Sequence, residues 1–340
     1  MKTILVTGGC GFIGSNFIHY MFNKYKEISI INVDALTYAG NTDNLNFLSN
    51  DSRYNFVQCN ICDFDLLKSV FEKYKPDVVV NFAAESHNDR AVLDPGIFVK
   101  TNVLGTQNLL EVCRIFGTRF HHISTCEVFG DLDLDDSNSF SEESPYKPRT
   151  PYNASKASAD HIVRAYFHTF KVPITISNCS NNYGPYQFPE KLIPLFVTNA
   201  IEDKPLPLFK SSGNKREWIH VLDHCEAIEL IINKGKIGES YNIGTGVEKS
   251  IEEISNIIVK VLNKSESIKQ YVNDRPGHDR RYLLNSSKIK KELGWVPKIE
   301  FDKGIFDTIL WYKDNTEWWK KLKNRNFSEY YNNYYNKLKN

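Results

Sequence analysis

Tyr152 and Lys156 are the pair of side chains in this 340-residue sequence best suited to acid–base chemistry. They lie four positions apart in a segment, near 152–170, that predicts a helix, so both side chains project from one face. A lysine ammonium beside a phenol favours the phenolate and lowers a pKa that is otherwise about 10. Ser124 and Thr125 end a predicted strand and can hydrogen-bond the same phenol oxygen. These residues therefore predict a site that exchanges a proton with a substrate hydroxyl.

A glycine-rich turn, TGGCGFIG (7–14), follows the first predicted strand and opens a helix. Gly8, Gly11 and Gly14 let the backbone turn tightly and approach a pyrophosphate, while the helix N-terminus supplies free N–H groups. Asp34 ends the second predicted strand, 20 residues after Gly14. A carboxylate there accepts hydrogen bonds from ribose hydroxyls and repels a 2′-phosphate, so the pattern predicts NAD rather than NADP. A glycine turn in an unrelated α/β protein is the alternative, but it leaves the coincidence of strand, turn, helix and acid unexplained.

Further residues are expected to contact NAD. Asn60 and Ile61 close the third strand and are placed to flank the adenine. Lys156 can hold the nicotinamide ribose in addition to its role beside Tyr152. The remaining expected cofactor contacts are Phe12, Ile13, Leu36, Thr37, Ala83 and Ala84.

Short β-rich runs alternate with longer helical stretches over the first 180 residues. The runs are continuous in apolar and β-branched residues, which is typical of buried parallel strands, and they cover 3–7, 28–33, 77–82, 119–124 and 172–178. Helical patterns lie between them near 12–24, 64–74, 97–116 and 152–170. This alternation predicts an α/β fold with a doubly wound parallel sheet of the Rossmann type. Beyond about residue 180 five prolines interrupt the rhythm, and further helices are expected near 221–234 and 250–263.

The chain is long enough for two domains. We expect an NAD-binding domain built from 1–178, 215–245 and about 303–325. A smaller substrate-binding domain is expected from 179–214 and 246–302. The tail, 326–340, is rich in Tyr and Asn and is either a docked helix or a loose end.

Composition excludes several classes of partner. The apolar fraction of 41% and charged fraction of 24% are ordinary for a globular protein, and a net charge of +1 favours neither nucleic acid nor an anionic membrane. The sequence contains no run of 18 apolar residues, so it predicts no transmembrane helix. The first strand follows Lys2 without a signal-peptide pattern, and the seven cysteines are an odd number, so reduced thiols in a cytoplasm are expected. Cys59 and Cys62 form a C-x-x-C, but without a second pair or a nearby His we expect no metal site.

Several longer motifs resemble those of the nucleoside-diphosphate-glucose 4,6-dehydratases, in the extended short-chain dehydrogenase/reductase superfamily. The resemblance runs from the first strand to about residue 312. Its most specific motifs are DALTYAGN (34–41), AAESHNDR (83–90), TNVLGT (101–106), STCEVFG (124–130), NCSNNYGPYQFPEKLIP (178–194) and DRPGHDRRY (274–282). The 4-epimerases of the superfamily share the glycines and the Tyr/Lys pair. They lack the acidic residue within 124–130 and the long Asn/Pro/Glu/Lys motif.

The resemblance implies a redox-neutral reaction in three stages on a nucleoside-diphosphate glucose. Tyr152 takes the proton of the C4 hydroxyl while hydride leaves C4 for NAD, and the resulting ketone acidifies the C5 proton. Glu127 removes that proton as general base, and water leaves from C6. The stored hydride then returns to C6 and a proton to C5, so NAD acts as a tightly held catalyst. The implied product is a nucleoside-diphosphate 4-keto-6-deoxyglucose, and Thr125 belongs to the implied catalytic set.

Cys126 departs from the family pattern, which has Asp before the glutamate to protonate the leaving C6 oxygen. A thiol has a free pKa near 8.5 and is a weaker hydrogen-bond donor than a carboxylic acid. Three alternatives follow: Cys126 serves as the acid, Glu127 serves as both base and acid, or dehydration is slow or lost. Phe129 replaces the family's usual Tyr and removes a hydroxyl next to the site, without an obvious chemical consequence.

Arg216 and Arg275 are the best candidates to bind the substrate diphosphate, because planar guanidinium groups match phosphate oxygens. They lie in KREW (215–218) and DRPGH (274–278), which match the family. The segment PLPLFKSSG (205–213) lies where the nucleobase should bind and differs from the family's usual stretch, so dTDP-glucose and UDP-glucose remain alternatives. The other expected substrate contacts are Ser86, His87, Thr125, Asn181, Glu190, Lys191, Leu192, Pro207, Phe209 and His278.

Two rival functions remain. A nucleotide-sugar 4-epimerase, or another NAD-dependent nucleotide-sugar modifier, would use the same fold, although Glu127 and the AAESH motif argue against it. An inactive regulator that binds a nucleotide sugar or NAD is supported only by Cys126. The resemblance also implies a homodimer, in which the helices near 97–116 and 152–170 pack as a four-helix bundle.

Overall fold

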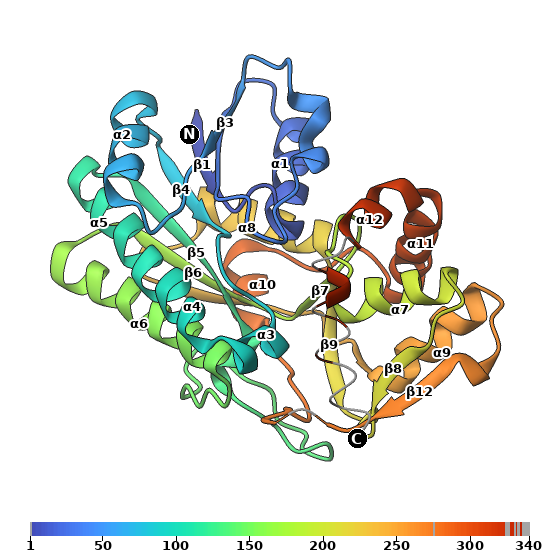
Figure 1. The fold of residues 1–340 in the computed structure, drawn as a ribbon. Helices are drawn as coiled ribbons and strands as arrows, with labels where there is room; N and C mark the ends of the chain where they lie inside the picture. The colour runs from blue at the N-terminus through green and yellow to red at the C-terminus, as the bar shows by residue number, and fades with distance from the viewer. Residues whose placement is uncertain (1, 275, 324–326, 330, 332–333, 335–340) are drawn as a thin grey trace.

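The computed structural model describes residues 2–274, 276–323, 327–329, 331 and 334. Its centre is a seven-stranded sheet of order β10-β6-β5-β4-β1-β2-β3 in which neighbouring strands are parallel (Figure 1). The strand order reverses between β1 and β4, which is where open parallel sheets bind ligands. The strands are β1 (Thr3–Thr7), β2 (Ser29–Asp34), β3 (Tyr54–Gln58), β4 (Val78–Asn81), β5 (Arg119–Thr125), β6 (Ile174–Cys179) and β10 (Ser240–Ile243).

Helices cover both faces of this sheet. One layer is α1 (Phe12–Lys24) and α8 (Val221–Lys234), and the other is α2 (Phe64–Tyr74), α5 (Thr106–Phe116) and α6 (Pro151–Phe170). Side chains alternate along each strand, so Ile4 and Val6 pack in the α1/α8 layer while Leu5 packs in the other. Burial on both faces explains why these strands are continuous apolar runs.

The helix predicted near 97–116 is interrupted. It consists of α4 (Pro95–Phe98), a π-helical stretch η2 (Val99–Gly105) and α5, and it is preceded by α3 (Asn88–Leu93). A Cβ at Gly105 would stand 2.5 Å from the Ile61 side chain, so η2 packs closely on the loop after β3. Glycine at this position therefore permits the close approach.

A second, smaller domain lies beside the sheet (Figure 1). It contains a three-stranded sheet, β11-β9-β7, and a two-stranded sheet, β12-β8. Its strands are β7 (Asn181–Tyr183), β8 (Leu206–Phe209), β9 (Lys215–His220), β11 (Glu248–Ser250) and β12 (Lys269–Val272). Its helices are α7 (Leu192–Ile201), α9 (Ile251–Val261), α11 (Phe301–Asp314) and α12 (Thr316–Leu322). The short elements η1 (Thr42–Leu48), η3 (Cys126–Phe129), η4 (Glu266–Ile268) and α10 (Ser287–Leu293) complete the assignment.

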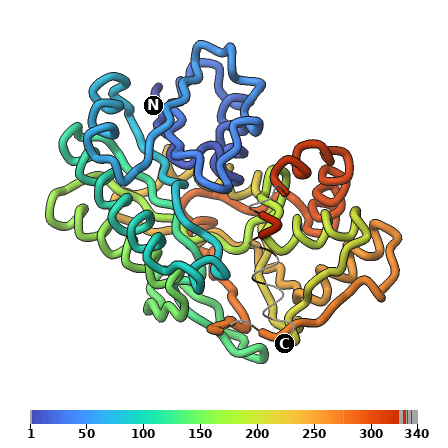
Figure 2. The backbone as a smooth tube through the Cα atoms, in the orientation of Figure 1, coloured from blue at the N-terminus to red at the C-terminus, as the bar shows by residue number. Residues whose placement is uncertain are grey.

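The predicted fold class, a doubly wound parallel sheet with a second, smaller domain, is confirmed. The exact domain bounds remain a prediction, but packing differs from them at 303–325. Ile305 and Trp319 of α11 and α12 share a buried cluster with α7 and α9, not with the large sheet. Figure 2 shows their trace, in red, beside the second domain. The sequence pattern of an amphipathic helix identifies a buried face but not the element on which that face packs, so it could not indicate this packing.

Two other segments also pack differently from the predicted bounds. Ile289 and Trp295 lie against α8 and β10 of the large domain, although 246–302 was expected in the small one. In the tail, the buried Phe327 packs on Phe188 of the second domain with ring centroids 6.2 Å apart. No described helix combines the length and apolar character that a membrane crossing requires.

Glu217 joins three segments beneath the second sheet. This fully buried carboxylate on β9 accepts hydrogen bonds from the backbone N–H groups of Gly246, at 2.7 Å, and Leu284, at 3.0 Å. Burial raises the pKa of Glu217 to about 7, against the lowering effect of these donors. The carboxylate therefore binds a proton more tightly in the folded state than in the unfolded chain.

We predict that the free energy of unfolding falls as pH rises from about 5 to about 7. The pKa of Glu217 is higher in the folded state than in the unfolded chain. Its contribution to stability is therefore fully present below the pKa of the unfolded chain and is lost above about pH 7. The contribution is at most about 3 kcal/mol. Glu217→Gln lowers stability at every pH, since its amide places a donor against a donor, but it removes this slope. Denaturant titrations across that pH range measure the slope, with the exposed Glu143→Gln as the matched control. Equal slopes for the wild type and Glu217→Gln would contradict the assignment.

Candidate active site

The glycine turn packs against the end of β4. Gly8 has φ +67°, and a Cβ there would stand 2.7 Å from the backbone nitrogen of Ala83. A Cβ at Gly14 would stand 2.3 Å from the Gly8 carbonyl oxygen. Among the described residues, a Cβ at Gly11 would have only that same oxygen within 4 Å, at 3.3 Å, so the backbone is accessible from the cavity here. The N-terminus of α1 thus opens onto a cradle that suits a pyrophosphate.

Asp34 is fixed at the end of β2 by two backbone donors. Its Oδ2 accepts from Cys10 N at 2.9 Å and its Oδ1 from Leu36 N at 2.8 Å. Burial raises the pKa of Asp34, and these two donors lower it. Leu36 was predicted to contact NAD, but it is not among the residues that line the cavity and instead contributes its N–H to the carboxylate.

A cavity of about 310 Å³ runs from this turn to Tyr152. Two peptide segments, 37–40 and 83–86, also line this cavity. The glycine cradle at one end and the carboxylate of Asp34 fit the pyrophosphate and a ribose of NAD. The predicted cofactor residues that line it are Gly8, Gly11, Phe12, Ile13, Gly14, Asp34, Thr37, Asn60, Ile61, Ala83, Ala84, Tyr152 and Lys156.

Tyr152 and Lys156 meet in this cavity, but not with the predicted electrostatics. Tyr152 is hydrogen-bonded to Thr125, as expected, yet burial and then the charge of Glu127 raise the pKa of Tyr152 well above its usual value. Lys156 Nζ donates instead to the Ile123 carbonyl at 2.7 Å. The expected lowering of the Tyr152 pKa by Lys156 is therefore not seen, because the ammonium is held against strand β5.

Asp160 compensates the buried lysine and was missed by the sequence analysis. The charge of Asp160 raises the pKa of Lys156, whereas burial lowers it more strongly. Ser124 Oγ donates to Asp160 at 2.7 Å, so Ser124 does not bind the tyrosine oxygen as predicted. Tyr146 donates to the same carboxylate at 2.9 Å. The signal was available in the sequence, because Asp160 follows Lys156 by four residues on the same helical face.

Glu127 lies where the first cavity meets a second one of about 150 Å³. It is carried by η3, and one carboxylate oxygen accepts from Asn88 Nδ2 at 2.8 Å. Cys126 lines neither cavity. Its side chain is packed in an apolar cluster with Val128 and Phe129, and burial raises the pKa of its thiol well above the usual value.

Residues from both domains line the second cavity. Arg216 is held there by backbone carbonyls, donating to Lys215 O at 2.7 Å and Asp279 O at 2.9 Å. His278 Nδ1 lies 3.0 Å from Ser211 Oγ. Arg275 lies outside the described residues. The predicted substrate residues that line this cavity are Ser86, His87, Asn181, Glu190, Lys191, Leu192, Pro207, Phe209, Arg216 and His278, whereas Thr125 lines the first.

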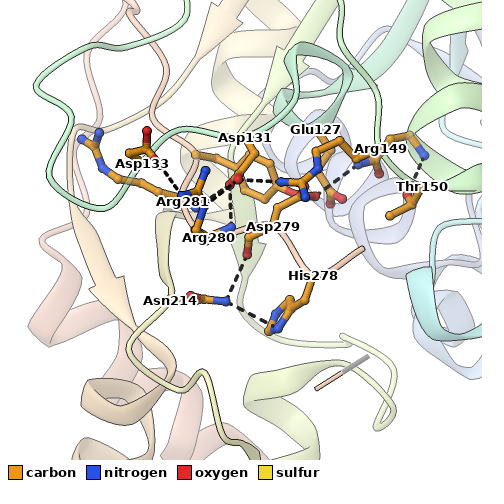
Figure 3. Close-up of polar contacts among 12 residues, drawn as sticks. Glu127, Asp131, Asp133, Arg149, Thr150, Asn214, His278, Asp279, Arg280 and Arg281 are labelled. Atoms are coloured by element: carbon orange, nitrogen blue, oxygen red, sulfur yellow. Dashed lines mark hydrogen bonds and ion pairs between the residues drawn. The ribbon is translucent and has the colours of Figure 1, made fainter. Parts of the chain in front are cut away.

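A polar network around Asp131 connects the loop after η3 with the strip that carries His278 (Figure 3). Asp131 accepts from the backbone N–H of Arg280 at 2.5 Å and forms an ion pair with Arg149 at 2.6 Å. Arg149 also lies 3.6 Å from the buried Asp279. These contacts tie the segment that carries Glu127 to one wall of the second cavity.

Comparisons with known proteins agree with this arrangement. The family profile described as GDP-mannose 4,6 dehydratase matches residues 5–308. The dTDP-glucose 4,6-dehydratase of Salmonella typhimurium is 45% identical over 344 residues, covering 94% of this chain and 95% of that protein. The solved dTDP-glucose 4,6-dehydratase of Streptomyces venezuelae, with NAD and TYD bound, is 44% identical with a TM-score of 0.91, covering 95% of this chain and 100% of that one.

More distant enzymes share the same fold. The UDP-glucose 4-epimerase of Thermus thermophilus, solved in complex with NAD, is 26% identical with a TM-score of 0.85, covering 92% of this chain and 100% of that one. The dehydratases are thus closer than this epimerase in both sequence and structure. On the family match and on the identity over nearly the whole chain, this protein belongs to the GDP-mannose 4,6-dehydratase family.

Proposed function

We propose that this chain is an NAD-dependent dTDP-glucose 4,6-dehydratase that forms dTDP-4-keto-6-deoxyglucose with loss of water. The observation that carries the proposal is that Tyr152 and Glu127 line one cavity that also contains the glycine cradle. A phenol and a carboxylate beside a nicotinamide site supply the two proton-handling groups that oxidation at C4 and elimination across C5–C6 require. The dTDP-glucose 4,6-dehydratase relatives support this activity over that of an epimerase.

The glycine turn, 7–14, and Asp34 would hold NAD. Bound NAD supplies a hydride acceptor and donor at C4 and C6 of the sugar. Tyr152 takes the C4 hydroxyl proton in its phenolate form, which the hydrogen bond from Thr125 favours by lowering the pKa of the phenol. Lys156, buried on the same helix, lines the same cavity with its ammonium bound to the Ile123 carbonyl.

Glu127 then removes the C5 proton, and we propose that it also delivers this proton to the C6 oxygen. The C5–H bond breaks, the C5–C6 double bond forms, and the C6–O bond breaks as water leaves with that proton. The burial of Cys126 in an apolar cluster supports this alternative over the thiol as acid. Hydride return to C6 and a solvent proton at C5 complete the balance.

We predict that the wild type converts dTDP-glucose to a product lighter by one water, and that Glu127→Gln slows this loss by about 10²–10⁴-fold because Gln accepts no proton. Oxidation at C4 should persist in Glu127→Gln, so reduced nicotinamide accumulates. Mass spectrometry of the sugar nucleotide and nicotinamide absorbance measure the two steps.

The matched control for this experiment is Glu143→Gln, an exposed carboxylate that should behave as wild type. UDP-glucose is run in parallel, because thymine and uracil differ by one methyl, worth about 1–3 kcal/mol in a pocket. An epimer of unchanged mass would replace the proposed activity with the epimerase. Binding without any turnover would indicate the inactive regulator.

We predict that Cys126→Ala keeps the rate of water loss within about threefold of the wild type, because the thiol faces the apolar cluster. Cys113→Ala is the matched control, since Cys113 is a buried thiol in another core cluster. Rates under saturating dTDP-glucose are compared, with thermal melts to correct for stability. A drop of about a hundredfold in Cys126→Ala alone would assign the acid to the thiol.

We also propose that the chain is a cytoplasmic homodimer. Exposed apolar side chains gather on α3, α4 and η2, namely Val92, Leu93, Ile97, Val99 and Leu104. Several exposed apolar side chains on consecutive helical segments favour a protein partner, and here a second copy burying the same helices is the simplest one. All seven cysteines are free thiols, which supports a reducing compartment.

We predict that replacing both Val99 and Leu104 with Glu converts the dimer to monomers, because two charges cannot be buried unpaired in an apolar interface. Sedimentation equilibrium measures the mass. Ile237→Glu, at a similarly exposed aliphatic position outside these helices, should leave the mass unchanged. A monomeric wild type would contradict the proposal.

A further inference from the structure

Asn88 joins the catalytic carboxylate to a neighbouring element. Its Nδ2 donates to Glu127 Oε2 at 2.8 Å, and its Oδ1 accepts from Thr150 Oγ1 at 2.7 Å. The side chain is buried at the first position of α3 and lines the second cavity. One amide therefore connects α3, η3 and the start of α6.

Thr150 fixes which way the amide points. Its hydroxyl oxygen accepts from Asn153 N at 3.2 Å, as the cap of α6, and donates its proton to Asn88 Oδ1. The oxygen of the Asn88 amide is thus occupied, and its NH₂ group faces the carboxylate. An ionised carboxylate accepts such a donor, whereas a flipped amide would place two acceptors against each other.

The same helix carries the reactive phenol. Thr150 lies two residues before Tyr152 and caps the helix that also contains Lys156. The chain of bonds from Thr150 through Asn88 therefore sets the position of Glu127 relative to the phenol. Among the described residues no other side chain donates to the Glu127 carboxylate, and Cys126 beside it packs into apolar surroundings.

We infer that Asn88 is a positioning residue that holds Glu127 and keeps Oε2 occupied, so that the proton taken from C5 resides on Oε1. An oxygen that accepts a locked amide N–H is the less available of the two for protonation. The proton then stays on the oxygen from which it can pass to the C6 hydroxyl. This inference rests on the proposed dehydratase activity and concerns its elimination step.

The inference is tested with Asn88→Ala and Asn88→Asp, assayed at saturating dTDP-glucose. Oxidation at C4, followed by nicotinamide absorbance, should stay within about threefold of the wild type. Exchange of the C5 proton with deuterated solvent and loss of water should both fall about 10–100-fold, as expected for a reacting group displaced by about 1 Å. In Asn88→Ala the acid limb of the elimination profile moves to higher pH, because a donor to the ionised carboxylate is lost. Asn88→Asp moves it further, through a second carboxylate.

Thr150 offers a matched pair of variants. Thr150→Val keeps the shape but loses the donor to Asn88 and the helix cap, so elimination should slow about 3–10-fold and the melting temperature should fall. Thr150→Ser keeps both bonds and should restore the wild-type elimination rate and pH profile. Thermal melts and NAD binding establish that each variant is folded.

The outcomes separate the two proposals. If the wild type removes no water from dTDP-glucose, the dehydratase proposal and the inference both fall. If the wild type is active but Asn88→Ala slows oxidation and elimination equally, or leaves the elimination profile where it was, the inference falls alone. Selective slowing of elimination, with rescue by Thr150→Ser over Thr150→Val, supports it.

Discussion

The burial of one ammonium group governs the arrangement of the active site. Lys156 is only 4% exposed, and a buried cation without a partner costs several kcal/mol. Asp160, one turn further along α6, supplies the compensating charge, and its own burial is offset by hydroxyl donors. Because Tyr152, Lys156 and Asp160 recur at intervals of four, they lie on one side of the helix. The side of α6 that carries this compensated charge is also the side from which Tyr152 bonds Thr125 at the end of β5.

The two domains meet around the cavity through polar contacts as well as apolar ones. Arg90 of α3 donates to Glu190 at 2.8 Å, and its guanidinium lies 3.7 Å from the centre of the Tyr38 ring. Tyr38 in turn meets Phe188 edge-on, with ring centroids 5.6 Å apart. The loop that follows Asp34 is therefore clamped against the second domain. Because Tyr38, Phe188 and Glu190 all line the first cavity, the same contacts that join the domains also shape the cofactor site.

Sequence reasoning succeeded where a local pattern has one physical meaning. The alternation of buried runs and helices, the glycine turn and the Tyr152/Lys156 spacing all describe local backbone geometry, and each was found where it was expected. It failed where the outcome depends on long-range packing. The apolar face of α11 did not reveal that its partner would be α7, and nothing near Lys156 in the sequence indicated that Ile123 O would bind the ammonium.

Asn88 illustrates the same limit at the site itself. It stands inside the motif AAESHNDR, yet its meaning depends on Thr150 and Glu127, which are 62 and 39 residues away in the chain. Local reasoning gives an asparagine at the start of a short helix a capping role, but the N-cap of α3 is His87, and both polar atoms of the Asn88 side chain bond these distant partners. Only the folded arrangement distinguishes a cap from a support for the carboxylate.

The replacement of a family aspartate by Cys126 is understandable in these terms. C5 and C6 are adjacent carbons, so a carboxylate that reaches the C5 proton also lies near the C6 oxygen, and one group can serve both in turn. Such a group must bind its proton on the oxygen that faces the sugar and must not rotate it away. The Asn88 amide, locked by Thr150, restrains the Glu127 carboxylate through its Oε2 atom and so fits that requirement. A buried thiol that takes no part in proton transfer is compatible with the proposed elimination, because in that proposal Glu127 carries out both proton transfers.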